Sequence, residues 1–274
     1  MNIPDLSLNQ GPTIPQLGFG VFQVPDDRAA DAVGEALAAG YRSIDTAAIY
    51  GNEEGVGRAV AASGLRREDL FITTKLWNDA HGAERAAPAY QQSLDRLGLD
   101  HVDLLLIHWP APAQGRYAET WRALEALQSS GRVRAIGVSN FTAAQLELLA
   151  AESGIVPAVN QVELHPYLQQ LPTRAYNQEH GIRTEAWSPL AQGAVLTDPV
   201  IARLAAAHGR TPAQVVLRWH LQQGRIVIPK SVTPARIREN LDVFGFDLSE
   251  ADLAAIDGLD RGLRTGPDPE TFNG

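Results

Sequence analysis

Residues 70–108 read LFITTKLWNDAHGAERAAPAYQQSLDRLGLDHVDLLLIH, in which two short apolar runs flank an amphipathic stretch. The runs 70–75 and 103–108 have the length of buried strands, and residues 83–97 repeat apolar side chains at helical spacing. Gly98 follows the amphipathic stretch, at a position where a helix often ends in a left-handed conformation. The segment therefore predicts a strand–helix–strand unit whose two strands pair in parallel.

The same alternation continues along the chain. Amphipathic stretches occupy residues 28–39, 117–130, 143–151, 173–180 and 212–223. Further apolar or β-branched runs occupy 16–20, 41–45, 134–139, 157–161, 183–187 and 225–230, which brings the expected strands to eight. Eight parallel strands with right-handed crossovers leave no open edge when the sheet closes. The chain is therefore predicted to be an α/β protein, a (β/α)8 TIM barrel, with a short N-terminal β-hairpin over 5–8 and 13–16.

A doubly wound sheet is the competing fold. It would need a glycine fingerprint between the first strand and its helix, but residues 17–23, LGFGVFQ, lack the third glycine of G-x-G-x-x-G. Residues 50–57, YGNEEGVG, are rich in glycine, yet the two glutamates would oppose a phosphate. Glu53 and Glu54 are better placed in the first turn of a helix, where acidic side chains are stabilising.

Composition limits the possible partners and compartments. The 274 residues, 45% hydrophobic and 20% charged, suit one barrel domain spanning residues 1–274. The net charge of −9 argues against nucleic acid or anionic membranes as partners. The chain has no cysteine, no secretory signal pattern and no apolar run of the roughly 20 residues that span a bilayer. From these features we expect a cytoplasmic protein. We also expect a monomer, because nothing in the sequence resembles an extended interface for self-association.

Reactive side chains follow several predicted strands. Asp45, Lys75 and His108 each end one, and Tyr50 lies five residues beyond Asp45. Carboxyl ends of barrel strands meet at one face, where the active sites of this fold are built. A carboxylate, a phenol, an amine and an imidazole are the groups needed to protonate a carbonyl oxygen. The alternative is a buried Asp45–Lys75 ion pair that only supports the barrel, but such a pair would not require the tyrosine and the histidine.

Two other chemistries find little support. His165 and Glu163 are two residues apart and no H-E-x-x-H pattern is present, so no metal site is expected. Residues 137–141, GVSNF, lack the second glycine of a nucleophile elbow, which argues against a serine hydrolase.

Seven motifs together resemble those of the aldo-keto reductases, closest in look to the bacterial 2,5-diketo-D-gluconate reductases. The resemblance runs from about Leu17 to Leu259. The motifs are IDTAAIYGNEEGVG (44–57), ITTKLWN (72–78), DLLLIHWP (103–110), IGVSNF (136–141), VNQVELHP (159–166), WSPLAQG (187–193) and IPKSVTPARIREN (228–240).

The resemblance implies a catalytic tetrad of Asp45, Tyr50, Lys75 and His108. Tyr50 would be the general acid in carbonyl reduction and the general base in alcohol oxidation. We expect Lys75 to stabilise the phenolate and lower the pKa of Tyr50. Asp45 would keep Lys75 charged and fixed, and His108 would donate to the carbonyl oxygen and orient it.

The resemblance also implies NADPH as the hydride donor, bound in an extended form without a Rossmann domain. Trp187 would stack on the nicotinamide, while Ser139, Asn140 and Gln161 would hydrogen-bond its carboxamide. Lys230 and Arg236 could bind a 2′-phosphate, and this contact would select NADP over NAD. The remaining expected cofactor residues are Ser188, Leu190 and Gln192 along the pyrophosphate, and Ser231, Val232, Thr233, Glu239 and Asn240 near the last strand.

Phe22, Trp77 and Trp109 match aromatic positions that shape the substrate pocket in this family. The tail over 263–274 is short, which favours an open pocket and a broad range of small aldehydes, dicarbonyls and keto-sugar acids such as 2,5-diketo-D-gluconate. Two alternatives stay open: a regulatory protein that binds NADP and turns over slowly, and an NAD-preferring alcohol oxidation, which Lys230 and Arg236 argue against.

Overall fold

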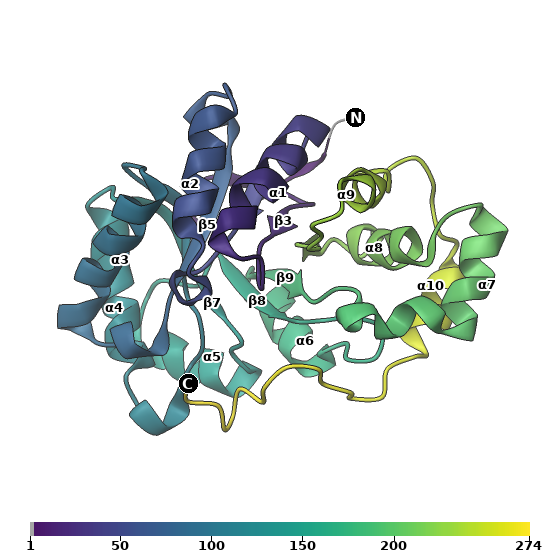
Figure 1. Ribbon diagram of the computed structural model, residues 1–274. Coiled ribbons are helices and arrows are strands. Elements are labelled where there is room, and N and C mark those ends of the chain that lie inside the picture. Colours follow the sequence, from purple (N-terminus) through teal and green to yellow (C-terminus); the bar gives the residue numbers. More distant parts are fainter. Residues whose placement is uncertain (1–2) are drawn as a thin grey trace.

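A closed barrel of parallel strands forms the centre of the computed structural model, which describes residues 3–274 (Figure 1). Neighbouring strands pair in chain order, so the eight predicted runs are confirmed as strands. They are β3 (Phe19–Gly20), β4 (Ser43–Asp45), β5 (Phe71–Leu76), β6 (Val102–Ile107), β7 (Val133–Ser139), β8 (Val159–Glu163), β9 (Arg183–Trp187) and β10 (Ile226–Val227).

The first and last strands close the barrel through main-chain hydrogen bonds. Val227 N donates to Gln16 O at 3.0 Å, and Gly18 N donates to Val227 O at 2.9 Å. Gly20 N donates to Pro229 O at 3.2 Å and extends this seam toward the carboxyl ends of the strands. Closure satisfies both edges of the sheet, as the barrel prediction requires.

Helices surround the strands (Figure 1). The α-helices are α1 (Asp26–Ala39), α2 (Glu53–Ala62), α3 (Ala83–Leu97), α4 (Tyr117–Ser129), α5 (Ala143–Glu152), α6 (Leu171–Glu179), α7 (Pro199–His208), α8 (Pro212–Gln222), α9 (Pro234–Leu241) and α10 (Glu250–Asp257). Short 3-10 helices are η1 (Ala48–Tyr50), η2 (Arg67–Asp69), η3 (Asn78–Ala80), η4 (Pro112–Gln114) and η5 (Ala191–Thr197). Within residues 3–274, no helix is both long and apolar enough to cross a membrane.

Two helices fall outside the one-helix-per-strand pattern that the sequence suggested. Helix α7 lies between β9 and α8, and its first turn is capped by the Asp198 side chain, which accepts from Val200 N. Helix α10 follows the last barrel helix and begins with a capping box formed by Ser249 and Asp252. Both helices thus carry local start signals, although neither belongs to the strand–helix repeat.

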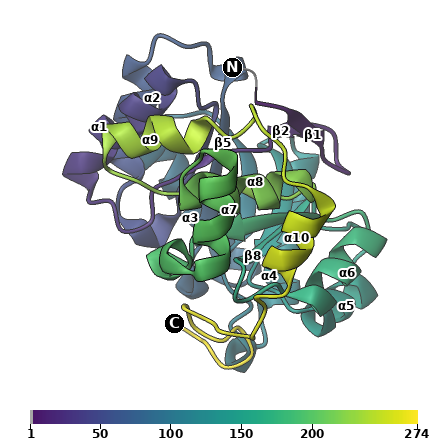
Figure 2. The same cartoon turned by 90° about the vertical axis from the view of Figure 1, so that its right-hand side faces the viewer.

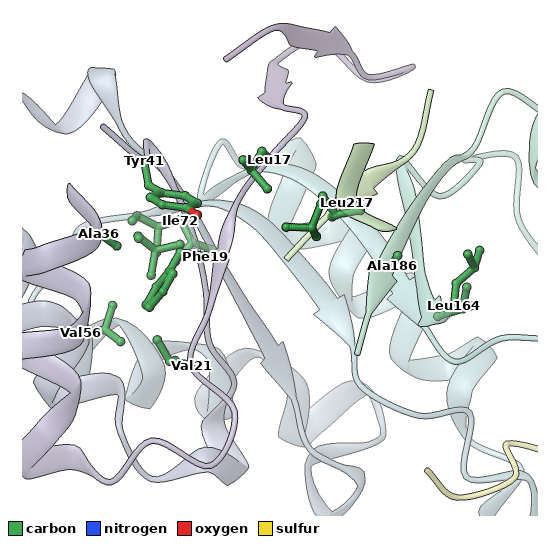
Figure 3. Packing of buried hydrophobic residues seen from close by; sticks show 14 of the residues in the cluster. Leu17, Phe19, Val21, Ala36, Tyr41, Val56, Ile72, Leu164, Ala186 and Leu217 are labelled. Atoms are coloured by element: carbon green, nitrogen blue, oxygen red, sulfur yellow. The ribbon is translucent and has the colours of Figure 1, made fainter. Parts of the chain in front are cut away.

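Two apolar clusters hold the barrel. The larger lies between the strands and the helices, where Phe19, Tyr41, Val56 and Ile72 pack together (Figure 3). The smaller fills the barrel interior, and Leu8 and Ile14 close it at one end. The predicted hairpin consists of β1 (Asp5–Ser7) and β2 (Thr13–Pro15); Leu8 follows β1, and Ile14 lies in β2. The hairpin and the C-terminal tail lie at opposite ends of the molecule (Figure 2). The hairpin end is therefore plugged, and the carboxyl ends of the strands carry the polar side chains.

Candidate active site

A buried ion pair lies at the centre of the open end. Lys75 in β5 is fully buried, and its Nζ lies 2.6 Å from Asp45 Oδ1 in β4. The same nitrogen donates to Thr46 O at 2.8 Å. Burial by itself would lower the pKa of Lys75, but the neighbouring Asp45, with Tyr50 and Glu185, outweighs it and raises the pKa. Lys75 is therefore held as an ammonium.

Tyr50 is brought to this pair by the turn that follows β4. It ends η1, and the centroid of its ring lies 5.2 Å from Lys75 Nζ and 5.6 Å from the centroid of the His108 ring. Asn52, completely buried, fixes the turn: its Nδ2 donates to Val21 O and Val24 O, and its Oδ1 accepts from Thr46 Oγ1 at 2.8 Å. The four residues of the predicted tetrad thus lie together.

Lys75 acts on the pKa of Tyr50 in the expected direction, but burial has the larger effect. Burial raises the pKa of Tyr50 to about 12, although Lys75 pulls it in the opposite direction. Burial and the charge of Lys75 lower the pKa of His108 well below its ordinary value, so its imidazole is neutral. Near neutral pH the site therefore presents a protonated phenol and a neutral imidazole beside one ammonium.

The predicted carboxamide-binding residues form a network beside the tetrad. Trp187 Nε1 donates to Asn140 Oδ1 at 2.8 Å, and Asn140 Nδ2 donates to His108 O and to Ser139 Oγ, both at 3.0 Å. Ser139 Oγ in turn donates to Gln161 O at 2.8 Å. Asn140 has a positive φ of 65°, a conformation that asparagine tolerates better than most residues. The structure brings these four residues together next to His108.

Glu185 is a buried site residue that the motif search missed. Gln161 Nε2 donates both to Asp45 Oδ2 at 2.8 Å and to Glu185 Oε2 at 2.9 Å. The available signal was alternation along β9, because residues two apart on a strand share a face and Glu185 lies two before Trp187.

The predicted phosphate-binding residues follow the last two strands. Lys230 and Arg236 are both exposed and form no ion pair with any residue in 3–274. Ser231 Oγ accepts from Thr233 N at 3.1 Å, and Glu239 Oε1 accepts from Thr211 Oγ1 at 2.7 Å. The other expected members are the exposed Val232, the buried Asn240, and, after β9, Ser188, Leu190 and Gln192.

Aromatic side chains border the tetrad, as expected for the pocket wall. The ring centroid of Phe22 lies 5.1 Å from that of Tyr50, and the centroid of Trp77 lies 5.1 Å from that of His108. Trp109 lies 6.5 Å from Trp187 by the same measure. Three predicted pocket residues therefore meet the site from different loops.

The C-terminal tail, although short, reaches this wall. The ring of Phe272 lies 4.6 Å from Trp109 and 6.2 Å from Trp77, centroid to centroid. Gly266 lies so close to Trp187 that a Cβ there would be 2.5 Å from its ring. The tail runs across the end of the molecule opposite the N-terminus (Figure 1). The short tail therefore contacts aromatic side chains at or just beyond the ends of β5, β6 and β9.

Glu163 at the end of β8 anchors the tail. Its Oε1 accepts from Thr265 N at 2.6 Å and from Thr265 Oγ1 at 2.5 Å, and its Oε2 accepts from Gly266 N at 3.0 Å. His165 Nε2 lies 3.0 Å from Glu163 Oε1. These partners keep the pKa of Glu163 below its ordinary value even though burial opposes them. We call this contact the tail latch.

Comparisons with known proteins show the family to which the chain belongs. An aldo-keto reductase of Mycobacterium sp. (strain KMS) is 53% identical over 273 residues, covering 100% of this chain and 99% of that protein. The methylglyoxal reductase DkgA of Yersinia pestis is 54% identical over 272 residues, covering 98% and 97%. The crystal structure of a Gox0644 mutant in complex with NADPH matches with a TM-score of 0.95 at 51% identity, covering 99% of each chain. The model of the Aldo/keto reductase family matches residues 16–261. The chain therefore belongs to the aldo/keto reductase family.

Proposed function

We propose that this protein reduces aldehyde and ketone carbonyls of small molecules to alcohols with NADPH, and that Tyr50 is the proton donor. The observation that carries the proposal is the packing of a protonated Tyr50 phenol between the Lys75 ammonium and the neutral His108 ring. Membership of the family supports the reaction class.

Each residue around the carbonyl oxygen has a separate role. NADPH, when bound, supplies the hydride. As negative charge develops on the carbonyl oxygen, Tyr50 transfers its phenolic proton to that oxygen and becomes a phenolate. Lys75 stabilises the phenolate, and Asp45, 2.6 Å away, keeps Lys75 in place. His108 is neutral and hydrogen-bonds the carbonyl oxygen without adding a charge.

The residues present fit NADPH. The amide nitrogen of Gln161 donates hydrogen bonds to two carboxyl groups. Its side-chain carbonyl oxygen is therefore the atom that would accept from the nicotinamide carboxamide. Trp187 lies beside Asn140, where its ring can stack on the nicotinamide. Lys230 and Arg236, exposed and without a carboxylate partner in 3–274, suit a 2′-phosphate. We assign Ser188, Leu190 and Gln192 to the pyrophosphate, and Ser231 to Thr233, Glu239 and Asn240 to the adenosine end.

Small dicarbonyls are the proposed substrates. The relative from Yersinia pestis is named a methylglyoxal reductase, and the aromatic wall with Phe272 over it favours a compact substrate. Keto-sugar acids such as 2,5-diketo-D-gluconate are the second class to test.

The test is consumption of NADPH, and separately of NADH, with methylglyoxal, other small aldehydes, diketones and 2,5-diketo-D-gluconate. We expect turnover with NADPH that weakens with NADH. The Lys230→Ala/Arg236→Ala double variant should raise the KM for NADPH at least about tenfold and change that for NADH little, because it removes two charge-assisted contacts.

Arg238→Ala is the matched control, because Arg238 lies on the same helix and pairs with Glu35 instead. An equal loss with NADH would contradict the phosphate assignment. Tight NADPH binding without turnover on any substrate would contradict the reductase proposal and favour the regulatory alternative.

A further inference from the structure

Glu185 is a carboxyl group enclosed in the barrel directly beside the tetrad. It is 1% exposed and pairs in register with Gln161 of β8 and Ile226 of β10. Its Oε2 accepts from the Gln161 amide nitrogen, which also donates to Asp45. One amide group therefore joins Glu185 to the carboxylate that holds Lys75.

No cation is bonded to Glu185 within residues 3–274; its hydrogen-bond donor is the neutral amide of Gln161. The charged or titratable groups facing it are Asp45 from β4, Lys75 from β5 and Tyr50 from η1, while its β10 neighbour Ile226 is apolar. Burial, reinforced by the charge of Asp45, raises the pKa of Glu185 to about 8, with Gln161 and Lys75 opposing. At neutral pH Glu185 is thus mostly a neutral acid beside the Asp45–Lys75 ion pair.

We propose that Glu185 is a positioning residue for carbonyl reduction: as a neutral acid it fixes the Gln161 amide and, through it, Asp45, and its ionisation slows proton donation by Tyr50. The proposal rests on the reductase function. Tyr50 becomes a phenolate when it gives up its proton, and a second anion beside Asp45 disfavours that negative charge. Carbonyl reduction should therefore slow as Glu185 loses its proton. A substitution that removes the Glu185 acceptor would, separately, leave a Gln161 N–H without its partner.

The first test is the pH dependence of kcat for methylglyoxal reduction in the wild type and in Glu185→Gln, which keeps the shape of the neutral acid and cannot ionise. The ratio of kcat at pH 9.5 to kcat at pH 7 should be about three- to tenfold lower in the wild type than in the variant. Asp103→Asn is the control, because it removes another buried carboxylate, one paired with Arg67 and Arg134 near the start of β6. Its pH profile should follow the wild type. Superimposable profiles for the wild type and Glu185→Gln would overturn the proposal.

The second test needs no turnover. The infrared carbonyl band of a neutral carboxylic acid should be present in the wild type at pH 7, disappear as the pH rises past about 8, and be missing from Glu185→Gln. Absence of that band from the wild type at pH 7 would overturn the inference whether or not the protein is active. A wild type that carries the band and reduces no carbonyl would instead contradict the proposed function alone.

Discussion

Lys75 is the residue on which the site most depends, because its ammonium is buried and bonded to Asp45 at 2.6 Å. Replacing it with Met leaves the carboxylate of Asp45 buried without its cation. We expect Lys75→Met to lower the free energy of unfolding by about 3–5 kcal/mol and to abolish measurable reduction. Urea unfolding and NADPH consumption measure the two effects.

The double variant Lys75→Met/Asp45→Asn separates the two roles of the pair. It should recover part of the lost stability, because no buried charge is left alone, and recover none of the activity. A single variant as stable as the wild type would contradict the assignment of a buried ion pair.

Single residues also show where sequence reasoning succeeds and where it ends. Asp45, Lys75 and His108 could be placed because strand ends are visible as the last residues of apolar runs. The pKa values of Tyr50 and Glu185 could not, because they depend on how much water the neighbouring segments exclude. Lys75 does act on Tyr50 with the expected sign, and burial is the larger effect.

Among the elements, the tail over 263–274 is anchored near its start by the carboxylate of Glu163. In Glu163→Gln the tail latch loses its charge and some of its hydrogen bonds to Thr265 and Gly266. We expect trypsin to cleave after Arg264 about tenfold faster in this variant, because the tail opens more often. Mass spectrometry of timed digests measures the rate.

Glu270→Gln is the control for tail charge, because Glu270 is exposed and lies in the same segment. It should be cleaved at the wild-type rate. Equal cleavage of all three proteins after Arg264 would show that the Glu163 contact does not hold the tail.

The tail and α7 illustrate what patterns in single elements leave out. Nothing in the Pro- and Gly-containing tail indicates that it crosses the mouth, because its anchor, Glu163, lies at the end of β8, far away in the chain. Helix α7 has apolar residues at helical spacing and a good cap at Asp198, but it is an addition to the strand–helix repeat. A prediction based on the strand–helix repeat therefore includes neither the position of the tail nor helix α7.

At the scale of the whole molecule, Glu185 links stability to pH. Its pKa is about 8 in the folded protein and 4.5 is the ordinary value, so between these values the folded state binds a proton that the unfolded state has released. Its contribution to stability is complete below about pH 4.5, declines as the pH rises and is lost above about pH 8.

Glu185→Gln removes this titration. The free energy of unfolding of the variant, minus that of the wild type, should grow by roughly 2–5 kcal/mol between pH 5 and pH 9. Urea unfolding across that range measures it. A difference that stays constant with pH would contradict a neutral Glu185.

The barrel as a whole could be predicted because eight apolar runs alternate with amphipathic stretches and each run matches an observed strand. The seam was less visible: β3 and β10 are two residues long, and the barrel closes through main-chain bonds of Gln16, Gly18 and Gly20 that no side-chain pattern encodes. The single domain over residues 1–274 and the monomeric state stay predictions.

The measurement that tests the central claim most directly compares the wild type with Tyr50→Phe in NADPH-dependent reduction of methylglyoxal, together with NADPH binding followed by fluorescence. Removing the phenolic proton should lower kcat/KM by about 10²–10⁴-fold, while the Kd for NADPH stays within about twofold, because only the proton donor is lost. A Tyr50→Phe variant that reduces methylglyoxal at the wild-type rate would contradict the account, since the proton would then come from another group.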